Sequence, residues 1–311
     1  MKKTLFKLTL LSLSLILCSC SSSAAQATDN DSPQQPAGNT ENIPAAAPSA
    51  QEVISADDLQ LTYTTETNDL GYESVVITMT NNTPYTILWP GVSYQLKDGL
   101  TEDELQAAMP EGFTYEAGGL ERNANSFSAS HSPCYLEPSE SIDQMELRIP
   151  IDPRIAGEFF IQECPATQEV LDLFEVKRIS GSPIVNGQLK ELSLTPGGSV
   201  PVDQLPAGYR LLNELPENGK DLILIPDGVE LYTTDDADLG GQPTLAFTFY
   251  DVSQDAKDKY FADYAAIYPI DSTGGDWYYD GNDEAGRSLS LTWYEDTHVI
   301  IGQIAFYNGR P

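Results

Sequence analysis

Basic side chains are scarce in this 311-residue chain, which carries 16 Lys and Arg against 47 Asp and Glu, a net charge of −31. A nucleic-acid-binding surface needs clustered Lys and Arg to neutralise phosphates, so the composition argues against nucleic acid as a partner. An anionic membrane surface would repel the chain for the same reason. The acidity is most simply explained by solubility and repulsion from other anionic surfaces.

Histidine is rarer still, with only His131 and His298 in the whole chain. A zinc site usually needs clustered His and Cys ligands. His131 stands three residues before Cys134, which could make half of a Cys-His nucleophile pair or two metal ligands. We favour the simpler interpretation of a loop histidine beside a structural cysteine, and we place His298 at a sheet edge or surface. We therefore expect no metal and no cofactor.

Catalytic motifs are also missing. The sequence contains no Gly-x-Ser-x-Gly, His-Glu-x-x-His, Ser-x-x-Lys or phosphate-binding loop. Carboxylates are abundant, so a glycosidase-like pair cannot be dismissed by counting, but no two of the 47 are singled out by spacing.

Long apolar runs are absent except in the leader, where Leu8 to Leu17 forms an apolar core behind Lys2, Lys3 and Lys7. A run of about ten residues is too short to span a bilayer, which needs roughly 20, but it suits a signal peptide. Residues 1–19 are therefore predicted to be removed on export.

The segment Leu17-Cys18-Ser19-Cys20 resembles the lipobox of bacterial lipoproteins, with a small residue before the modified cysteine. The resemblance implies that Cys20 receives a diacylglycerol and that its new amino terminus receives a further acyl chain such as palmitate. Two or more chains anchor stably because each buried methylene contributes about 0.8 kcal/mol. The expected location is the extracytoplasmic face of the cell membrane; an ordinary secreted protein is the alternative.

Cleavage would remove three lysines and no acid, leaving 13 basic against 47 acidic side chains and a net charge of −34. Residues 20–55 then read as a lipidated cysteine and a disordered tether, since they are rich in Ser, Ala and Pro and lack aromatic residues. A chain of 35 such residues reaches about 30–35 Å on average. Two further cysteines, Cys134 and Cys164, could form a disulfide outside the cytoplasm, or could be buried free thiols.

Short alternating runs bounded by Gly and Pro follow the tether and predict an antiparallel sandwich. Strands are predicted at 59–64, 75–80, 142–149, 174–179, 188–194 and 209–214. Ile87 to Leu96 predicts a pair of short strands around Pro90-Gly91. Thr101 and Glu104 form a capping box for one short helix, and a second is expected at 167–173.

This region resembles the bacterial immunoglobulin-like domains of Gram-positive lipoproteins. The likeness rests on the Asn81-Asn-Thr-Pro84 turn after a strand, the strand around Tyr94, and Leu205-Pro-Ala-Gly-Tyr-Arg210, which would open the last strand. It covers residues 56–215. That span exceeds the roughly 100 residues of a plain sandwich, so residues 101–133 are interpreted as an insertion.

Residues 220–311 predict a small α+β domain in the order β-β-α-β-β-β, with a helix from Ser253 to Tyr268. The pattern resembles the small α+β domain appended to bacterial lipoproteins of unknown role, through Pro226-Asp-Gly228 and Trp277. The fold class expected overall is mainly β, an immunoglobulin-like antiparallel sandwich followed by an antiparallel sheet with one helix.

The best candidate for a ligand surface gathers aromatic, acidic and amide side chains in Asp276 to Glu284. Its chosen members are Trp277, Tyr279, Asp280 and Asp283. The competing interpretation is a strand whose Trp277 and Tyr279 face the core, followed by an acidic turn. Asp235 to Asp238 has the spacing that starts a calcium loop but lacks its terminal Glu, so weak Ca²⁺ binding is the most it predicts.

Together these patterns favour a non-catalytic module at the cell envelope that binds an envelope protein or a glycan. The alternatives are an envelope hydrolase that uses carboxylates in residues 101–133, or a structural spacer. A fold resemblance cannot decide between them, because function depends on the site.

Overall fold

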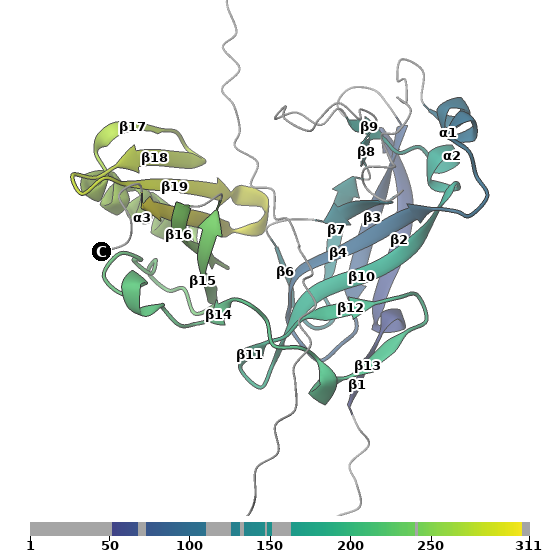
Figure 1. The fold of residues 1–311 in the computed structure, drawn as a ribbon, viewed down its shortest axis with the longest axis horizontal. Helices are drawn as coiled ribbons and strands as arrows, with labels where there is room; N and C mark the ends of the chain where they lie inside the picture. The colour runs from purple at the N-terminus through teal and green to yellow at the C-terminus, as the bar shows by residue number, and fades with distance from the viewer. Residues whose placement is uncertain are drawn as a thin grey trace, which may run out of the picture.

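A computed structural model describes residues 52–67, 73–109, 126–130, 134–146, 148–150, 163–239 and 242–306. The predicted signal peptide, Cys20, the tether up to residue 51, most of the predicted insertion and His131 lie outside these residues. The expected fold class is confirmed: the chain is mainly β, its sheets are antiparallel, and helices are few among the described residues (Figure 1).

The first group of elements carries most of the strands. Its members are β1 (Val53–Ser55), β2 (Leu59–Thr67), β3 (Glu73–Asn81), β4 (Ile87–Leu96), α1 (Glu102–Ala108), β5 (Ser126–Ser130), β6 (Tyr135–Leu136), β7 (Ser141–Glu146), β8 (Arg148–Pro150), β9 (Glu163–Pro165), α2 (Gln168–Leu171), β10 (Phe174–Val185), β11 (Gln188–Leu189), β12 (Leu192–Leu194) and β13 (Ser199–Pro201).

Two antiparallel sheets of this group share one core. One sheet has the order β2-β3-β7, and the other has β11-β10-β4-β5, with β12 paired to β10 and β6 paired to β4. Apolar side chains from both meet between them, including Ile77 and Met79 of β3, Val92 and Tyr94 of β4, and Ile179 of β10. Each of these is almost fully buried, and the arrangement is compatible with an immunoglobulin-like sandwich.

Two short helices begin where the sequence predicts. The Thr101 hydroxyl caps α1 by accepting a hydrogen bond from the Glu104 amide. The Glu104 carboxylate accepts one from the Thr101 amide, which completes the capping box. Thr167 caps α2 by accepting a hydrogen bond from the backbone of Val170. The side-chain oxygens satisfy amide groups that the first helical turn leaves unpaired.

The predicted break at Pro90-Gly91 does not occur, because β4 runs continuously across it. Trp89 takes a left-handed backbone conformation with φ 48°, and the pairing of β4 with β10 shifts register between Ser180 and Ser182. Pro90 has no amide hydrogen to donate to β10, and the bulge interrupts the pairing at this point so that the strand can continue beyond it.

The second group of elements begins with a strand that the sequence assigned to the sandwich. It comprises β14 (Leu211–Leu212), β15 (Tyr232–Leu239), β16 (Gln242–Phe249), α3 (Gln254–Ile267), β17 (Ile270–Gly274), β18 (Tyr278–Asn282), β19 (Arg287–Tyr294) and β20 (Val299–Phe306). β14 pairs with β15, so the strand predicted at 209–214 is shorter than expected and does not close the sandwich. β17 is an additional strand that was not predicted.

These strands form one seven-stranded sheet in the order β14-β15-β16-β20-β19-β18-β17, and α3 packs on one of its faces (Figure 1). Ser253 caps α3, as predicted. Phe247 and Phe249 of the sheet meet Tyr260 and Tyr264 of the helix, with ring centroids of Phe249 and Tyr260 5.6 Å apart. Aromatic pairs at this separation add to the stabilisation from burial alone.

A smaller apolar cluster, which we call the joint, connects the two groups of elements. Tyr250, after β16, is buried against Trp89 and Tyr135 of the first group, at ring-centroid distances of 6.4 and 5.8 Å. The Arg210 guanidinium lies 4.8 Å from the centre of the Trp89 ring and donates a hydrogen bond to the Thr248 hydroxyl. Both residues are partly buried, and a cation–π contact in such a setting contributes on the order of 1 kcal/mol.

Candidate ligand-binding surface

The candidate surface is built around the turn from β17 to β18. Gly274 and Gly275 lead into Asp276 and Trp277, and the amide of Gly275 donates a 2.9 Å hydrogen bond to the Tyr278 carbonyl. A Cβ on Gly274 would come within 3.0 Å of the Tyr279 ring, which explains why glycine fits this position. The two glycines therefore allow a tight turn that brings Trp277 to the end of the sheet.

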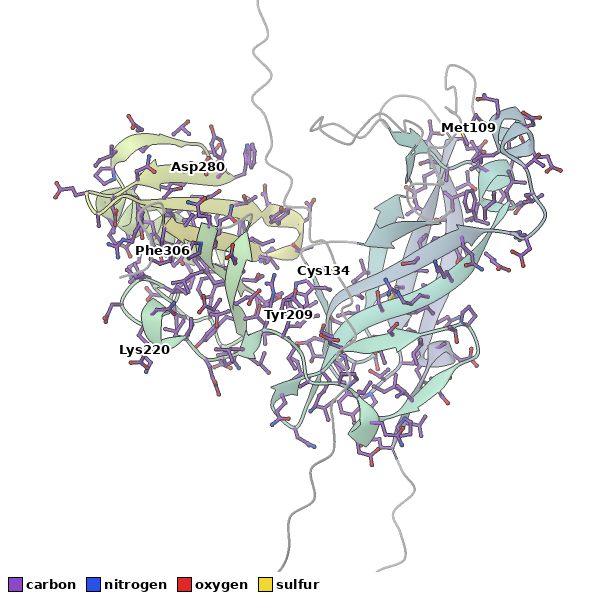
Figure 2. The ribbon with its side chains drawn as sticks, viewed as in Figure 1. Met109, Cys134, Tyr209, Lys220, Asp280 and Phe306 are labelled. Atoms are coloured by element: carbon purple, nitrogen blue, oxygen red, sulfur yellow. The ribbon has the colours of Figure 1, made fainter. Side chains whose placement is uncertain are left out.

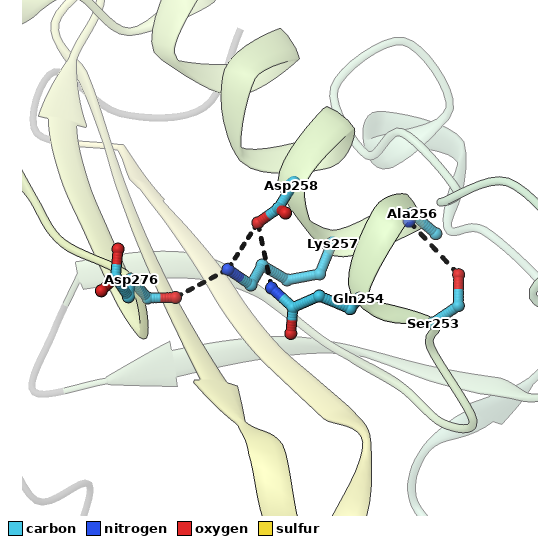
Figure 3. A network of polar contacts seen from close by, with 6 residues as sticks. All are labelled: Ser253, Gln254, Ala256, Lys257, Asp258 and Asp276. Carbon is cyan, nitrogen blue, oxygen red and sulfur yellow. Dashed lines mark hydrogen bonds and ion pairs between the residues drawn. The ribbon is translucent and has the colours of Figure 1, made fainter.

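A buried lysine on α3 holds this turn in place (Figure 3). The Lys257 ammonium donates hydrogen bonds of 2.7 Å to the Asp276 carbonyl and to a carboxylate oxygen of Asp258. It also lies 5.3 Å from the centre of the Phe261 ring. The hydrogen bond from Lys257 lowers the pKa of Asp258. Because buried charges need partners, this lysine is an anchor between helix and turn.

Trp277 is exposed although its backbone is fixed. Its carbonyl accepts a 2.7 Å hydrogen bond from the amide of Trp293, while 45% of its surface stays accessible to solvent. Its ring lies 4.6 Å from that of Tyr278, at an angle of 49°. A large aromatic side chain held on a rigid backbone and left exposed can contact a ligand at low entropic cost.

The four residues predicted for this site do not converge. Tyr279 packs partly against the core and donates a hydrogen bond of 2.7 Å to the Tyr268 carbonyl. Asp283 is buried and accepts hydrogen bonds from the backbone amides of Ala285 and Arg287 and from the Arg287 guanidinium. Both serve the local fold, so the competing interpretation holds for Tyr279 but not for Trp277.

Asp280 follows Tyr279, which packs against the core below α3, so alternation places Asp280 on the sheet face opposite α3, which we call the open face. Figure 2 labels Asp280 in this sheet. Directly opposite residues of antiparallel strands share a face. Tyr278, Asp280 and Asn282 pair with Thr292, Ser290 and Ser288, and Ser290 pairs in turn with Gln303. The open face is thus defined by these seven half-buried side chains, Tyr278, Asp280, Asn282, Ser288, Ser290, Thr292 and Gln303.

Sequence reasoning missed Tyr278 and Lys257. Strand alternation could have found Tyr278, since it fixes which neighbours of Asp280 share its face. Lys257 carried no comparable signal, because a lysine in an amphipathic helix usually lies on the solvated face. Only the folded chain shows that its ammonium reaches the Asp276 carbonyl.

Cys134 and Cys164, for which the sequence left open either a disulfide or two free thiols, lie on separate parts of the sandwich. Cys134 is a free, buried thiol, and burial raises its pKa to about 12. The Cys134 carbonyl accepts a hydrogen bond from the Trp89 amide at one end of the sandwich. β9, which contains Cys164, instead contacts β3, and Ala166 just after it accepts a hydrogen bond from the Val75 amide. β6 and β9 lie apart in Figure 1, and a disulfide needs Cα atoms within about 7 Å. The free thiol, the other alternative, therefore holds for Cys134; the side chain of Cys164 lies outside the described residues.

The other candidate residues occupy structural positions. Asp235, Asp236 and Asp238 lie on β15, where alternation sends neighbours to opposite faces, and no group of three metal-ligating side chains occurs in the described part of the chain. Burial raises the pKa of Asp235, and Arg210 opposes that shift. His298 ends a turn in the left-handed region at φ 54°, beside Trp293.

A shallow pocket of about 230 Å³ opens at the edge of the sandwich between β2 and β10. Phe174 and Val176 form its apolar wall, and the hydroxyls of Tyr63 and Tyr94 meet across it at 3.1 Å. Burial raises the pKa of both tyrosines. Its volume is below the roughly 300–1,000 Å³ of typical small-molecule sites, so the Trp277 surface is the stronger candidate.

Comparison of the chain with protein-family models, curated proteins and solved structures gives no match. None of the helices in the described ranges has the length and apolar character needed to cross a bilayer.

Proposed function

We propose that this chain is a lipid-anchored protein of the extracytoplasmic membrane face that binds cell-wall glycan without catalysis. Its anchor would be Cys20, and its first group of strands an immunoglobulin-like domain that carries the second, glycan-binding one. The lipobox at Leu17 to Cys20 and the low-complexity tether support the location. The two facing antiparallel sheets and the Asn81 turn support the domain type.

The exposed Trp277 carries the proposal. Sugar rings present an apolar face of C–H groups that packs on aromatic rings, and hydroxyls at their rim that hydrogen-bond to carboxylates, amides and hydroxyls. The paired rings of Trp277 and Tyr278 supply the aromatic surface for the sugar ring. The open face, with Asp280 and Gln303, supplies the hydrogen-bonding groups for the sugar hydroxyls. A strongly acidic chain would be repelled by anionic wall polymers, so the favoured ligand is the uncharged glycan strand.

The test is co-sedimentation of the mature chain, with Cys20→Ser to prevent lipidation, with insoluble purified cell-wall glycan. We expect Trp277→Ala to weaken binding about tenfold, which corresponds to about 1.4 kcal/mol. Tyr209→Ala is the matched control, because Tyr209 is also an exposed aromatic residue but lies just before β14, at the opposite edge of the sheet from β18. Equal binding by wild type and Trp277→Ala would refute the glycan site.

A protein partner is the second candidate, favoured by the same exposed tryptophan, since aromatic residues concentrate at protein interfaces. Photo-crosslinking from position 278 in cells distinguishes the two. Capture of glycan supports the proposal, whereas one dominant cross-linked protein supports the alternative. Release of soluble sugar from the glycan during the sedimentation assay would instead indicate a hydrolase, and no capture at all would leave the structural spacer.

The lipid anchor is tested separately by intact mass measurement of the protein extracted from membranes. Lipidation would add a diacylglycerol and a further acyl chain at Cys20 after loss of residues 1–19. Cys20→Ala should abolish the added mass and release the protein from the membrane fraction. An unmodified chain that begins elsewhere would contradict the anchor.

A further inference from the structure

The outer edge of β2 is a long strand edge with no neighbour among the described strands. β2 is the first strand in the order β2-β3-β7, and its nine residues pair with β3 in an unbroken register from Leu59↔Asn81 to Thr67↔Glu73. Residues 62–67 are all exposed. Since an edge strand uses only one of its two sides, a row of backbone amides and carbonyls faces outward here.

This edge lacks the usual devices that prevent strand pairing between molecules. Natural proteins protect edges with lysine, proline, bulges or short strands. The sequence of β2, LQLTYTTET, has no lysine, proline or glycine and is rich in β-branched threonine. The edge strand β17 of the other sheet is protected, because it has only five residues, a register shift between Ile270 and Thr273, and Asp271 at φ 49°.

The charge of β2 indicates which partner the edge accepts. Glu66 is its only charged side chain, in a chain with 47 acidic residues. A basic partner would find little to attract it here, whereas two identical copies could approach along this strip with less repulsion than elsewhere on the molecule. The same edge on both copies is self-complementary under two-fold symmetry.

We propose that two copies of this chain pair antiparallel through their β2 strands, which joins two three-stranded sheets into one of six strands. A two-fold axis perpendicular to the strands makes the pairing antiparallel, the geometry β2 already has with β3. The inference does not depend on the glycan site, which lies in the other sheet.

The pairing has a characteristic response to salt. Strand pairing alone buries a small interface, and small interfaces belong to weak complexes. Two copies carrying a large negative charge repel each other, and the Debye length falls from about 10 Å at 0.1 M salt to about 3 Å at 1 M. Dimerisation should therefore strengthen as salt rises, whereas association driven by opposite charges would weaken.

Sedimentation equilibrium of the mature Cys20→Ser chain, in reductant to exclude intermolecular disulfides, measures this directly. Thr64→Pro and Thr65→Pro are compared, because neighbouring residues of a strand point their amides to opposite sides. One variant loses only an outward amide, and the other loses a bond to β3. The variant that keeps the wild-type melting temperature should require at least tenfold higher concentration to dimerise.

Ser272→Pro in β17 is the control, since it places proline in the other edge strand and should leave dimerisation unchanged. Wild-type protein that remains monomeric at millimolar concentration and 1 M salt would overturn the proposal. So would a dimer that is equally stable in the folded β2 proline variant. Loss of glycan binding in Trp277→Ala with dimerisation intact would separate the two surfaces.

Discussion

The polar side chain of Asn81 shows how one residue can organise the connection between two sheets. Its amide nitrogen donates to the carbonyls of Tyr85 and Leu136 at 2.8 and 3.0 Å, and its oxygen accepts from the backbone and hydroxyl of Thr83. The residue is completely buried, yet its hydrogen-bonding groups are satisfied. Buried polar groups are tolerated only on that condition.

Replacing Asn81 should therefore be costly. Asn81→Ala leaves buried donors and acceptors without partners, at about 1–3 kcal/mol for such a group. Chemical denaturation measures the loss. Asn82→Ala is the matched control, because the neighbouring asparagine is exposed and should change stability by less than about 0.5 kcal/mol. Equal effects of the two substitutions would contradict this role for Asn81.

The sequence revealed the turn at Asn81 but not the network around it. Turn chemistry is local, so Asn-Asn-Thr-Pro predicts a change of direction wherever it occurs. The contact with Leu136 joins residues 55 positions apart, and no local pattern encodes it. Trp277 presents the same limit, since strand alternation suggested that it could face the core but only tertiary packing leaves it exposed.

At the scale of elements, helix α3 carries a ladder of tyrosines on its buried face. Tyr260, Tyr264 and Tyr268 follow one another at intervals of four, with ring centroids 4.9 and 5.9 Å apart. The four-residue spacing places Tyr260 and Tyr264 on one side of the helix, and Tyr268 follows directly after its last residue. The helix predicted from Ser253 to Tyr268 is thus confirmed. Burial raises the pKa of Tyr268 to about 12 and raises that of Tyr260 well above 10.

These shifts predict alkaline unfolding. In the unfolded chain a tyrosine ionises near pH 10, whereas the folded chain keeps these hydroxyls protonated, so stability is complete below pH 10 and is lost as pH rises toward 12. Each such group contributes a slope of about 1.4 kcal/mol per pH unit. Tyrosinate absorbance and near-ultraviolet circular dichroism should change together.

Tyr260→Phe removes one of these groups and should reduce the loss, while Tyr209→Phe should not, because Tyr209 is exposed. Separate transitions, with tyrosinate forming before the tertiary signal is lost, would contradict the prediction.

Most elements were foreseen, because periodicity and capping are local properties. The exceptions are short strands: β1, β5, β6, β9, β13 and β17, none longer than five residues, were not predicted, and β14 keeps only two residues of the strand predicted at 209–214. β14 belongs to the second sheet because Leu211 and Leu212 pair with Thr234 and Thr233, which lie more than 20 residues further along the chain. Pairing at that distance decides sheet membership, and alternation within a strand cannot report it.

At the scale of the whole molecule, the joint determines whether the two groups of elements move independently. Trp89 and Arg210 form a cation–π contact at the joint. The buried Cys134 lies close enough to Tyr250 to contribute to its raised pKa. Figure 2 shows Cys134 between the two groups of elements. A covered thiol reports opening of its surroundings, since reagents reach it only when the cover moves.

Trp89→Ala should therefore accelerate labelling of Cys134 by a thiol reagent in the native protein by tenfold or more, because it removes both the ring over Arg210 and the contact with Tyr250. Cys20→Ser and Cys164→Ser in the mature chain leave one thiol to observe. Trp277→Ala serves as the control, since that ring is remote from the joint in sequence and in its contacts. An unchanged labelling rate would mean that Trp89 does not keep the joint closed.

The position of β1 has a further consequence. The chain enters the sandwich through β1, which pairs with β13, and in Figure 1 these strands lie at the end of the molecule far from β17 and β18. With the proposed lipid anchor at Cys20, the sandwich would lie between the membrane and the sheet that carries Trp277. The distance of Trp277 from the bilayer would then be the reach of the tether plus the length of the sandwich, so shortening the tether would change which layer of the cell wall Trp277 can contact.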